Sequence, residues 1–208
     1  MVVATRKRAA RRSPDERRQQ LLGCALRVFA RRGLGRGGHA HVAAEADVAV
    51  PTVFAYFHTR GDLVEAVLAE VRAFYDDMAE RCHRPGVPAP RAILDHAIAF
   101  AASVDSHRDH ARILLEWSAS VREEIWPLYV RQQQDIIARF RATLERGQAE
   151  GSIPRGLDAE DTAMMIVGSW HGVAQMKFMR YPPDKVLRFL LALLRAAIGS
   201  DALAAAHA

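Results

Sequence analysis

The sequence is poor in cysteine and has no long uninterrupted apolar run. Its two cysteines, Cys24 and Cys82, lie in apolar helical patterns and have no paired spacing. This argues against a disulfide framework or a thiolate metal site and indicates a reducing compartment. The charged N-terminus is not followed by the apolar segment of a secretory signal, and Arg188 and Arg195 interrupt the C-terminal apolar stretch. We therefore expect a soluble, cytoplasmic protein.

Motifs of catalysis and cofactor binding are missing as well. There is no G-x-S-x-G nucleophile pattern, and the glycine cluster at 33–38 lacks the Lys-Ser/Thr of a phosphate-binding loop. His107 and His110 lie three residues apart, and His39 and His41 lie two apart, but no carboxylate or cysteine stands at metal-binding spacing. The sequence therefore predicts no enzyme, no metal and no cofactor.

What the sequence does have is an uneven distribution of charge. Residues 1–36 hold eleven lysines and arginines against Asp15 and Glu16, a net charge of +9, whereas the whole chain carries +5, so that the remainder carries −4. A basic segment on a mildly acidic body indicates a polyanionic partner at one end of the protein. A solvated charged face is the alternative.

The spacing of apolar residues is helical nearly throughout and predicts an all-α protein. Ser13, Pro14 and Glu16 form a capping box with proline at the first helical position, which marks the start of a helix that stops at Arg32-Gly33. A connecting helix that starts within Thr59–Asp62 and ends near 84 carries a single apolar stripe. The other expected helices lie at about 39–46, 50–57, 91–104, 107–121, 124–148, 158–179 and 183–199.

The two short helices after the basic segment match a helix-turn-helix unit. HAHVAAEA would form the positioning helix and VPTVFAYF the reading helix, with Val48 as the buried anchor of the turn. Val53 and Phe57 lie four residues apart and should face the core. The residues left facing outward are Val50, Pro51, Thr52, Phe54, Ala55 and Tyr56, with His58 and Arg60 beside them.

Such an outward face suits the major groove of DNA, where apolar groups meet the thymine methyl and hydroxyls bind bases or phosphates. His39 and His41, at the start of the positioning helix, join the candidate DNA contacts. An ordinary pair of helices with buried aromatics is the alternative for this stretch.

The string VAAEADVAVPTVFAYFHTRGDLVEAVL resembles the N-terminal signature of TetR-type regulators, and RGGHA and EWSAS resemble the LuxR/HapR/SmcR-type quorum-sensing master regulators within that family. The likeness is strong over 6–83, good over 107–150 and faint over 158–180. It implies a homodimer that binds a double-stranded, pseudo-palindromic operator, with Val50, Pro51, Thr52 and Ala55 near bases and Phe54, Tyr56 and Arg60 near the backbone. It also implies a minor-groove arm, which here would contain Arg6, Lys7, Arg8, Arg11 and Arg12.

The sequence departs from the family pattern in and near the turn. Asp47 replaces the usual turn glycine, and Ala49 replaces the usual capping serine, so the reading helix has no side-chain N-cap, at a cost of roughly 1 kcal/mol. Ala55 replaces a polar residue that is common in the subgroup, which puts a shared operator sequence in doubt.

The predicted domains are a basic arm at 1–12, a three-helix helix-turn-helix domain at 13–60, a larger helical bundle for ligand binding and dimerisation at 61–200, and a flexible tail at 201–208. An aromatic and methionine-rich lining would suit a small apolar or aromatic effector; its candidates are Tyr75, Met78, Trp117, Ile137, Phe140, Met165 and Trp170. Ordinary core packing is the alternative for these residues. The candidates for the dimer interface are Met164, Gly168, His171, Leu190, Leu193, Leu194 and Ala197.

The leading hypothesis is thus a sequence-specific, dimeric transcription regulator. A basic protein that coats the nucleoid or a membrane surface without sequence preference is the alternative. It is disfavoured because the basic residues precede an organised reading helix and do not line one amphipathic face. We expect no membrane partner.

Overall fold

The computed structural model describes residues 13–121 and 124–206, and within these segments all regular structure is helical, which confirms the predicted all-α class. The chain divides into two compact units, one up to Val67 and one from Leu68. The division lies inside a continuous helix, whereas the sequence predicts it between residues 60 and 61. The predicted arm residues Arg6, Lys7, Arg8, Arg11 and Arg12 lie outside the described residues.

The first helix, α1 (Pro14–Arg32), begins as the sequence predicts. The Glu16 amide donates to Ser13 Oγ at 3.2 Å, and the Ser13 amide donates to Glu16 Oε2 at 2.8 Å. This reciprocal pair satisfies two amides that would otherwise lack helical partners. The helix ends at Gly33, whose φ of 86° is one that side chains disfavour.

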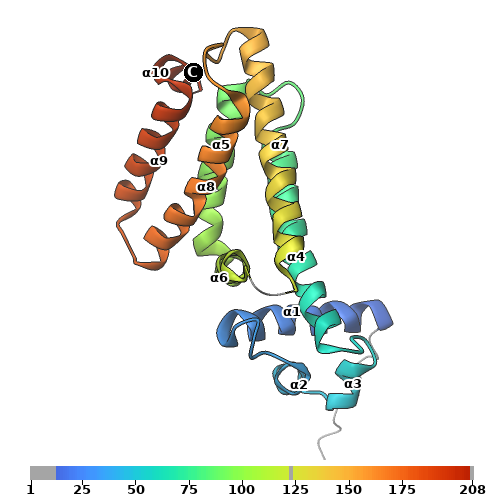
Figure 1. Ribbon diagram of the computed structural model, residues 1–208. Coiled ribbons are helices and arrows are strands. Elements are labelled where there is room, and N and C mark those ends of the chain that lie inside the picture. Colours follow the sequence, from blue (N-terminus) through green and yellow to red (C-terminus); the bar gives the residue numbers. More distant parts are fainter. Residues whose placement is uncertain (1–12, 122–123, 207–208) are drawn as a thin grey trace, which may run out of the picture. The chain divides into compact units, whose positions relative to one another are not determined.

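Two short helices follow, α2 (His39–Ala46) and α3 (Val50–Phe54), and α2 packs against both α1 and α3 (Figure 1). The bounds of α2 are as predicted, and Val42, Ala43 and Ala46 on it are buried. The reading helix is shorter than the predicted 50–57: it ends at Phe54 and continues as a turn, in which the amide of Phe57 donates to the carbonyl of Val53 at 3.0 Å.

The connecting helix, α4 (Arg60–Cys82), opens with a second capping pair, in which Thr59 and Asp62 each donate a backbone amide to the other's side chain at 3.0 Å. Its predicted apolar stripe is confirmed as buried; the members are Val64, Val67, Leu68, Val71, Tyr75 and Met78. The residues of this stripe up to Val67 belong to the first unit, and those from Leu68 onward belong to the second unit.

Within residues 83–121 and 124–206, six helices after α4 complete the second unit. Helix α7 packs against α8, α5 and α6, and α8 packs against α5 and α9 (Figure 1). The bounds are α5 (Ala89–Ser106), α6 (Arg108–Ala119), α7 (Trp126–Glu150), α8 (Ala159–Phe178), α9 (Pro183–Ile198) and α10 (Ser200–Ala205). None of the helices within the described segments is long and apolar enough to cross a membrane.

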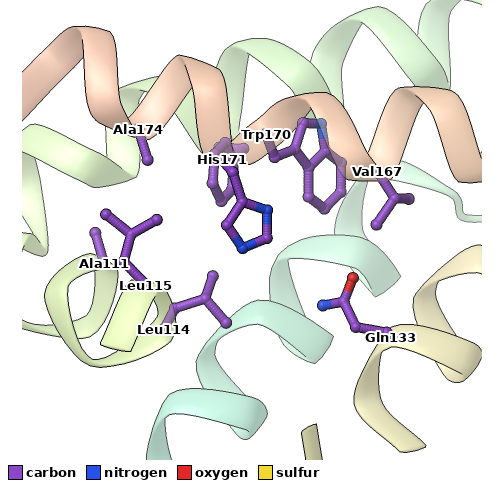
Figure 2. A pocket seen from close by; sticks show the side chains of 9 residues that line it. Ala111, Leu114, Leu115, Gln133, Val167, Trp170, His171 and Ala174 are labelled. Carbon is purple, nitrogen blue, oxygen red and sulfur yellow. The ribbon is translucent and has the colours of Figure 1, made fainter. Parts of the chain in front are cut away.

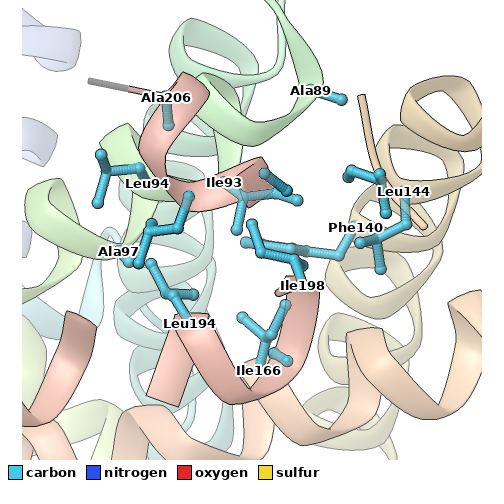
Figure 3. Close-up of a cluster of buried hydrophobic side chains, with 14 of the residues drawn as sticks. Ala89, Ile93, Leu94, Ala97, Phe140, Leu144, Ile166, Leu194, Ile198 and Ala206 are labelled. Atoms are coloured by element: carbon cyan, nitrogen blue, oxygen red, sulfur yellow. The ribbon is translucent and has the colours of Figure 1, made fainter. Parts of the chain in front are cut away.

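The core of this unit is an aliphatic cluster to which α5, α7, α8, α9 and α10 all contribute, and Figure 3 shows Ile93, Phe140, Ile166 and Ile198 converging from four of these helices. The cluster includes Ala202, Leu203 and Ala206. The expectation of a flexible tail at 201–208 is therefore wrong for residues 201–206. The final turn is ordered because its apolar side chains are buried against the core.

Candidate nucleic-acid interface and ligand pocket

The reading segment is held by two inward anchors. Val53 is fully buried and Phe57 is 2% exposed, whereas Val50 is 37% and Phe54 45% exposed. Pro51 and Ala55 are also exposed, and Thr52 and Tyr56 are half-buried. The α3 segment therefore presents a face of methyl groups and aromatic ring edges with a hydroxyl at its margin, which is the outward face that the four-residue spacing of Val53 and Phe57 predicts.

His39 supports this face from within the unit and is not itself displayed. Its side chain is buried, Nε2 lies 2.7 Å from the carbonyl oxygen of Phe57, and its ring stacks on Phe54 at 3.9 Å between centroids and 3° between planes. The prediction that His39 contacts DNA is therefore wrong: the ring sits against Phe54 and leaves the phenyl group with one open face. His41 is half-buried, and its Nδ1 has no hydrogen-bond partner among the described residues.

Arg60 has a structural role within the unit, and its contact with the DNA backbone stays a prediction. Its Nε donates to the carbonyl of Gly37 at 3.0 Å, and Nη2 donates to the carbonyl of Leu34. The guanidinium thereby ties the start of α4 to the glycine-rich link between α1 and α2. His58 is exposed, and its role as a DNA contact stays a prediction.

Part of the positive charge on α1 is already neutralised within the unit. Arg27 Nε lies 2.9 Å from Glu45 Oε1, and Arg31 pairs with the other oxygen of the same carboxylate. Hydrogen bonds from these two arginines lower the pKa of Glu45, which therefore stays ionised. The basic segment consequently offers fewer free charges to a polyanion than its composition suggests.

The turn carries the two departures noted in the sequence. Asp47 adopts the left-handed conformation (φ 52°, ψ 53°), which aspartate tolerates better than most residues do. Ala49 occupies the N-cap of α3 in an extended conformation and makes no side-chain cap bond, as expected. The predicted anchor Val48 is only half-buried.

Two adjoining hollows lie inside the second unit and share Phe100, Leu114, Gln133 and Trp170 as walls. One continues toward Val167 and His171 on α8, and Figure 2 shows Leu114, Gln133, Trp170 and His171 around it. The other continues toward Tyr75 on α4, His96 on α5 and Gln132 on α7. Their volumes are about 20 and 30 Å³, which is room for a water or two and not for a larger molecule.

Of the predicted pocket residues, only Tyr75 and Trp170 line these hollows. Trp117 is 1% exposed and donates its indole N–H to the carbonyl of Ile125 at 3.0 Å, and Met78 is buried in the α4 stripe. Phe140 and Ile137 belong to the aliphatic core or pack against it, and Met165 is 48% exposed on the surface of α8. The structure therefore places five of the seven predicted residues in the core or at the surface.

A buried polar chain borders the second hollow. His83 Nδ1 lies 2.7 Å from Thr143 Oγ1, and His83 Nε2 lies 2.9 Å from His96 Nδ1. Burial lowers the pKa of His83 to about 4 and that of His96 to about 3, with nearby Arg139 acting in the same direction. Both imidazoles are therefore neutral at physiological pH. Burial raises the pKa of Tyr75 to about 12, so its hydroxyl keeps its proton.

Several residues of the predicted dimer face are also buried in the core. Leu190 (4% exposed), Leu194 (1%) and Ala197 (7%) are buried in the aliphatic core of the second unit and are not displayed to a partner. Leu193 is half-buried against that core, and His171 is half-buried at the first hollow. The exposed apolar or small residues of α8 and α9 include Met164, Met165, Gly168, Leu187, Phe189, Ala192 and Ala196.

Sequence reasoning missed the polar walls of the hollows, although a signal was present. Gln132 lies four residues before Ile136 and eight before Phe140, and His96 lies four before Phe100, so each polar residue falls on an apolar helical stripe. A polar residue at such a position is buried and needs a partner or a ligand. Across residues 13–121 and 124–206, no group of three or more His, Cys, Asp or Glu side chains is placed to hold a metal ion.

Comparison with known proteins gives a consistent result for both units. The family model described as "Bacterial regulatory proteins, tetR family" matches residues 21–67, and "Tetracyclin repressor-like, C-terminal domain" matches residues 90–175. The chain is 42% identical over 151 residues to the HTH-type transcriptional regulator LuxR of Vibrio harveyi, which covers 70% of this chain and 73% of the relative.

Solved structures with the same fold include proteins bound to DNA and to a small molecule. A cysteine mutant of the TetR family regulator CifR, in complex with 26-bp double-strand operator DNA, has a TM-score of 0.74 at 19% identity and covers 92% of this chain and 99% of its own. The SmeT–triclosan complex has a TM-score of 0.71 at 19% identity and covers 90% of this chain and 93% of its own.

Proposed function

Since the chain belongs to the TetR family of DNA-binding transcriptional regulators, we propose that it acts as a homodimer that reads a pseudo-palindromic operator with α3. One observation carries this proposal: the inward anchors Val53 and Phe57 turn Val50, Pro51 and Phe54 outward. A twofold dimer would present two such faces about 34–36 Å apart, the distance between successive major grooves on one side of the duplex.

Thr52 provides the most direct test of base reading. It is half-buried at the margin of the exposed face, and its hydroxyl makes no hydrogen bond among the described residues. Thr52→Val keeps the shape and removes the hydroxyl, whereas Thr52→Ser keeps the hydroxyl. If the hydroxyl reads a base, Thr52→Val changes the preference among operator variants by about 1–3 kcal/mol and Thr52→Ser changes it less. Equal weakening on every operator would show that Thr52 only positions the helix.

The role of the N-terminal basic segment is tested by salt dependence. Deletion of residues 1–12 should weaken binding to every DNA and flatten the plot of log affinity against log salt by about 0.9 for each phosphate that the segment neutralises. An unchanged slope would count against an arm in the minor groove. Equal affinity of the intact protein for all fragments of a promoter library at moderate salt would support the nonspecific alternative.

For the dimer, we propose that the interface is the exposed face of α8 and α9 around Met164, Gly168 and Phe189. A Cβ added at Gly168 would meet nothing within 4 Å in its own subunit, so this part of α8 is open to close approach by another helix. Phe189→Glu should convert the dimer to monomers in sedimentation velocity. Val121→Glu, an exposed apolar residue on another part of the unit, is the matched control and should leave the dimer intact.

We further propose that a small apolar or aromatic effector enters the hollows around Trp170 and alters operator affinity. The mostly apolar walls support this, as does the triclosan bound to SmeT, which has the same fold. The quorum-sensing role implied by the resemblance to LuxR-type regulators is also a proposal. Mapping of occupied genomic sites at low and high cell density tests it: occupancy that does not change with density would remove that role and leave the DNA-binding proposal intact.

A further inference from the structure

The two hollows share one wall, the indole of Trp170. This ring stacks on Phe100 at 4.9 Å between centroids and 17° between planes, and it also lies 4.8 Å from the ring of His96. Trp170 is half-buried and makes no hydrogen bond with its N–H among the described residues. Because it lines both hollows, a rotation of its side chain would enlarge both spaces at once and expose the flat face of Phe100. A flat aromatic molecule could take the place of the indole in that stack.

The hydrogen-bond chain beside the hollow fixes what His96 offers to such a molecule. Thr143 Oγ1 has one proton, and it lies 3.1 Å from the carbonyl of Arg139, which can only accept. With that proton committed, Thr143 Oγ1 accepts from His83 Nδ1–H, and the neutral His83 must then accept at Nε2 from His96 Nδ1–H. This arrangement makes three hydrogen bonds, whereas the opposite direction of the chain makes two. The remaining nitrogen of His96, Nε2, is therefore an unprotonated acceptor.

Gln132 supplies a second acceptor on the same wall. Its side chain is 5% exposed, and Oε1 is buried without a hydrogen-bond partner among the described residues. The hydroxyl of Tyr75, on the facing helix α4, is likewise buried without a hydrogen bond of ordinary geometry. The Tyr75 hydroxyl carries a proton and can donate, whereas Gln132 Oε1 can only accept. A buried acceptor without a donor is costly, so Gln132 Oε1 marks a place where a donor from a ligand would be stabilised.

Charge on the ligand is disfavoured. Asp76 is the charged residue on the wall of the second hollow, and it is already paired with Arg72 at 3.2 Å. The first hollow is lined by apolar residues with Gln133 and a half-buried His171. Burial lowers the pKa of His171, which keeps that ring neutral as well. An ion that entered would lose its hydration without gaining an unpaired partner of opposite charge.

We propose that the cavity beside Trp170 takes a flat, uncharged aromatic molecule that donates a hydrogen bond, through a ring N–H or an O–H, to Gln132 Oε1 or His96 Nε2. That the cavity admits an effector at all rests on the proposed function. The selection of a donor follows from the acceptors on its wall. A molecule of the same shape that cannot donate would leave those acceptors unpaired and would bind more weakly.

Indole and benzofuran form a matched pair of probes because they have the same bicyclic shape, and only indole carries an N–H. Calorimetric titration of the full-length protein should show indole binding about tenfold or more tightly than benzofuran, since a buried acceptor stays unsatisfied with the latter. The comparison uses the wild-type protein and so does not depend on the folding of any variant. Equal affinities, tighter binding of benzofuran, or no binding of either probe would overturn the proposal.

Two substitutions locate the acceptor. Gln132→Met keeps the length of the side chain and removes the oxygen, and His96→Asn keeps a donor toward His83 and removes the Nε2 acceptor. One of them should reduce the preference for indole to within about threefold, and Gln134→Met, an exposed neighbour on α7, should leave it unchanged. A preference that survives both Gln132→Met and His96→Asn, each checked for its helical content by circular dichroism, would place the probe elsewhere and overturn the proposal.

Operator binding measured on the same samples separates this inference from the proposed function. If indole binds with the expected preference and operator affinity does not change, donor selection stands and the effector role fails. If the protein shows no preference among DNA fragments, the proposed function fails whatever the calorimetry shows.

Discussion

Acidification should destabilise the second unit through the buried pair of His83 and His96. The two rings share a hydrogen bond of 2.9 Å, and burial lowers their pKa values to about 4 and about 3. An imidazole in the unfolded chain has a pKa near 6.5. As the pH falls below this value the unfolded chain takes up protons first, so the free energy of unfolding decreases. The contribution of the pair is complete above about pH 7 and is lost progressively toward pH 4 and pH 3.

The size of this decrease in the free energy of unfolding depends on the pH interval that is compared. Between pH 7 and pH 5 each ring of the unfolded chain takes up a proton, whereas both rings stay neutral in the folded protein. The interval from the unfolded pKa near 6.5 down to pH 5 is about 1.5 pH units, so the free energy of unfolding decreases by roughly 2 kcal/mol per ring and about 4 kcal/mol for the pair. His110 and His171, whose pKa values are also lowered by burial, add to the loss in the same direction.

Urea denaturation followed by tryptophan fluorescence at pH 7, 6 and 5 measures this loss. The control is the double variant His83→Gln/His96→Asn, which cannot titrate at these positions and keeps every carboxylate. Its absolute stability will be lower, but its decrease between pH 7 and pH 5 should be smaller than that of the wild type by about 3–4 kcal/mol. If both proteins lost the same free energy over this interval, the buried, neutral state of the two rings would be refuted.

Four further substitutions test other parts of the fold. Ala49→Ser should raise the free energy of unfolding of the first unit by about 1 kcal/mol, because it supplies the missing cap of α3; no gain in thermal denaturation would mean that the cap site is already satisfied. Gly147→Ala should destabilise by up to about 2 kcal/mol, since the added Cβ would lie 2.7 Å from Ile153 Cδ1. The matched Gly61→Ala, whose added Cβ would make only an ordinary contact with Thr59 Oγ1 at 3.5 Å, should be neutral or stabilising by up to about 1 kcal/mol. Arg60→Ala should lower stability by roughly 2 kcal/mol, because the buried carbonyl of Gly37 would lose its donor, and should leave the salt dependence of operator binding unchanged; a slope flatter by about 0.9 would show instead that Arg60 contacts a phosphate.

The features that the sequence predicted well are those encoded by neighbouring residues. The capping box at Ser13 and Glu16, the bounds of α2 and the inward pair Val53 and Phe57 each depend on residues three or four positions apart, which local stereochemistry fixes. The division into helices follows from the same periodicity. These signals need no knowledge of what lies on the other side of the core.

The mistakes concern contacts between residues that are distant in sequence. His39 is predicted on the DNA-facing surface, but its ring nitrogen meets a carbonyl eighteen residues away. Trp117 and Trp170 look equivalent in the sequence, as aromatic residues on amphipathic helices. Only the packing shows that one of them is tied to the Ile125 carbonyl and the other forms a wall of the hollows. A large side chain on an apolar stripe predicts burial, and it cannot tell whether the partner is core, cavity or a second subunit.

Polar residues on apolar stripes are a better guide to the cavity than the aromatic residues are. Gln132 and Thr143 on α7 and His96 on α5 are all buried, where leucine would give a simpler core. A buried polar side chain with its partners missing reduces stability by about 1–3 kcal/mol, so stability alone gives no reason for Gln132 at this position. Thr143 and His96 are satisfied through His83, and the unsatisfied oxygen of Gln132 lies on the wall of the same hollow that His96 borders. Buried polar side chains that reduce stability are therefore gathered at one wall of the hollow. A site for a hydrogen-bonding ligand requires such an arrangement, and core packing gives no reason for it.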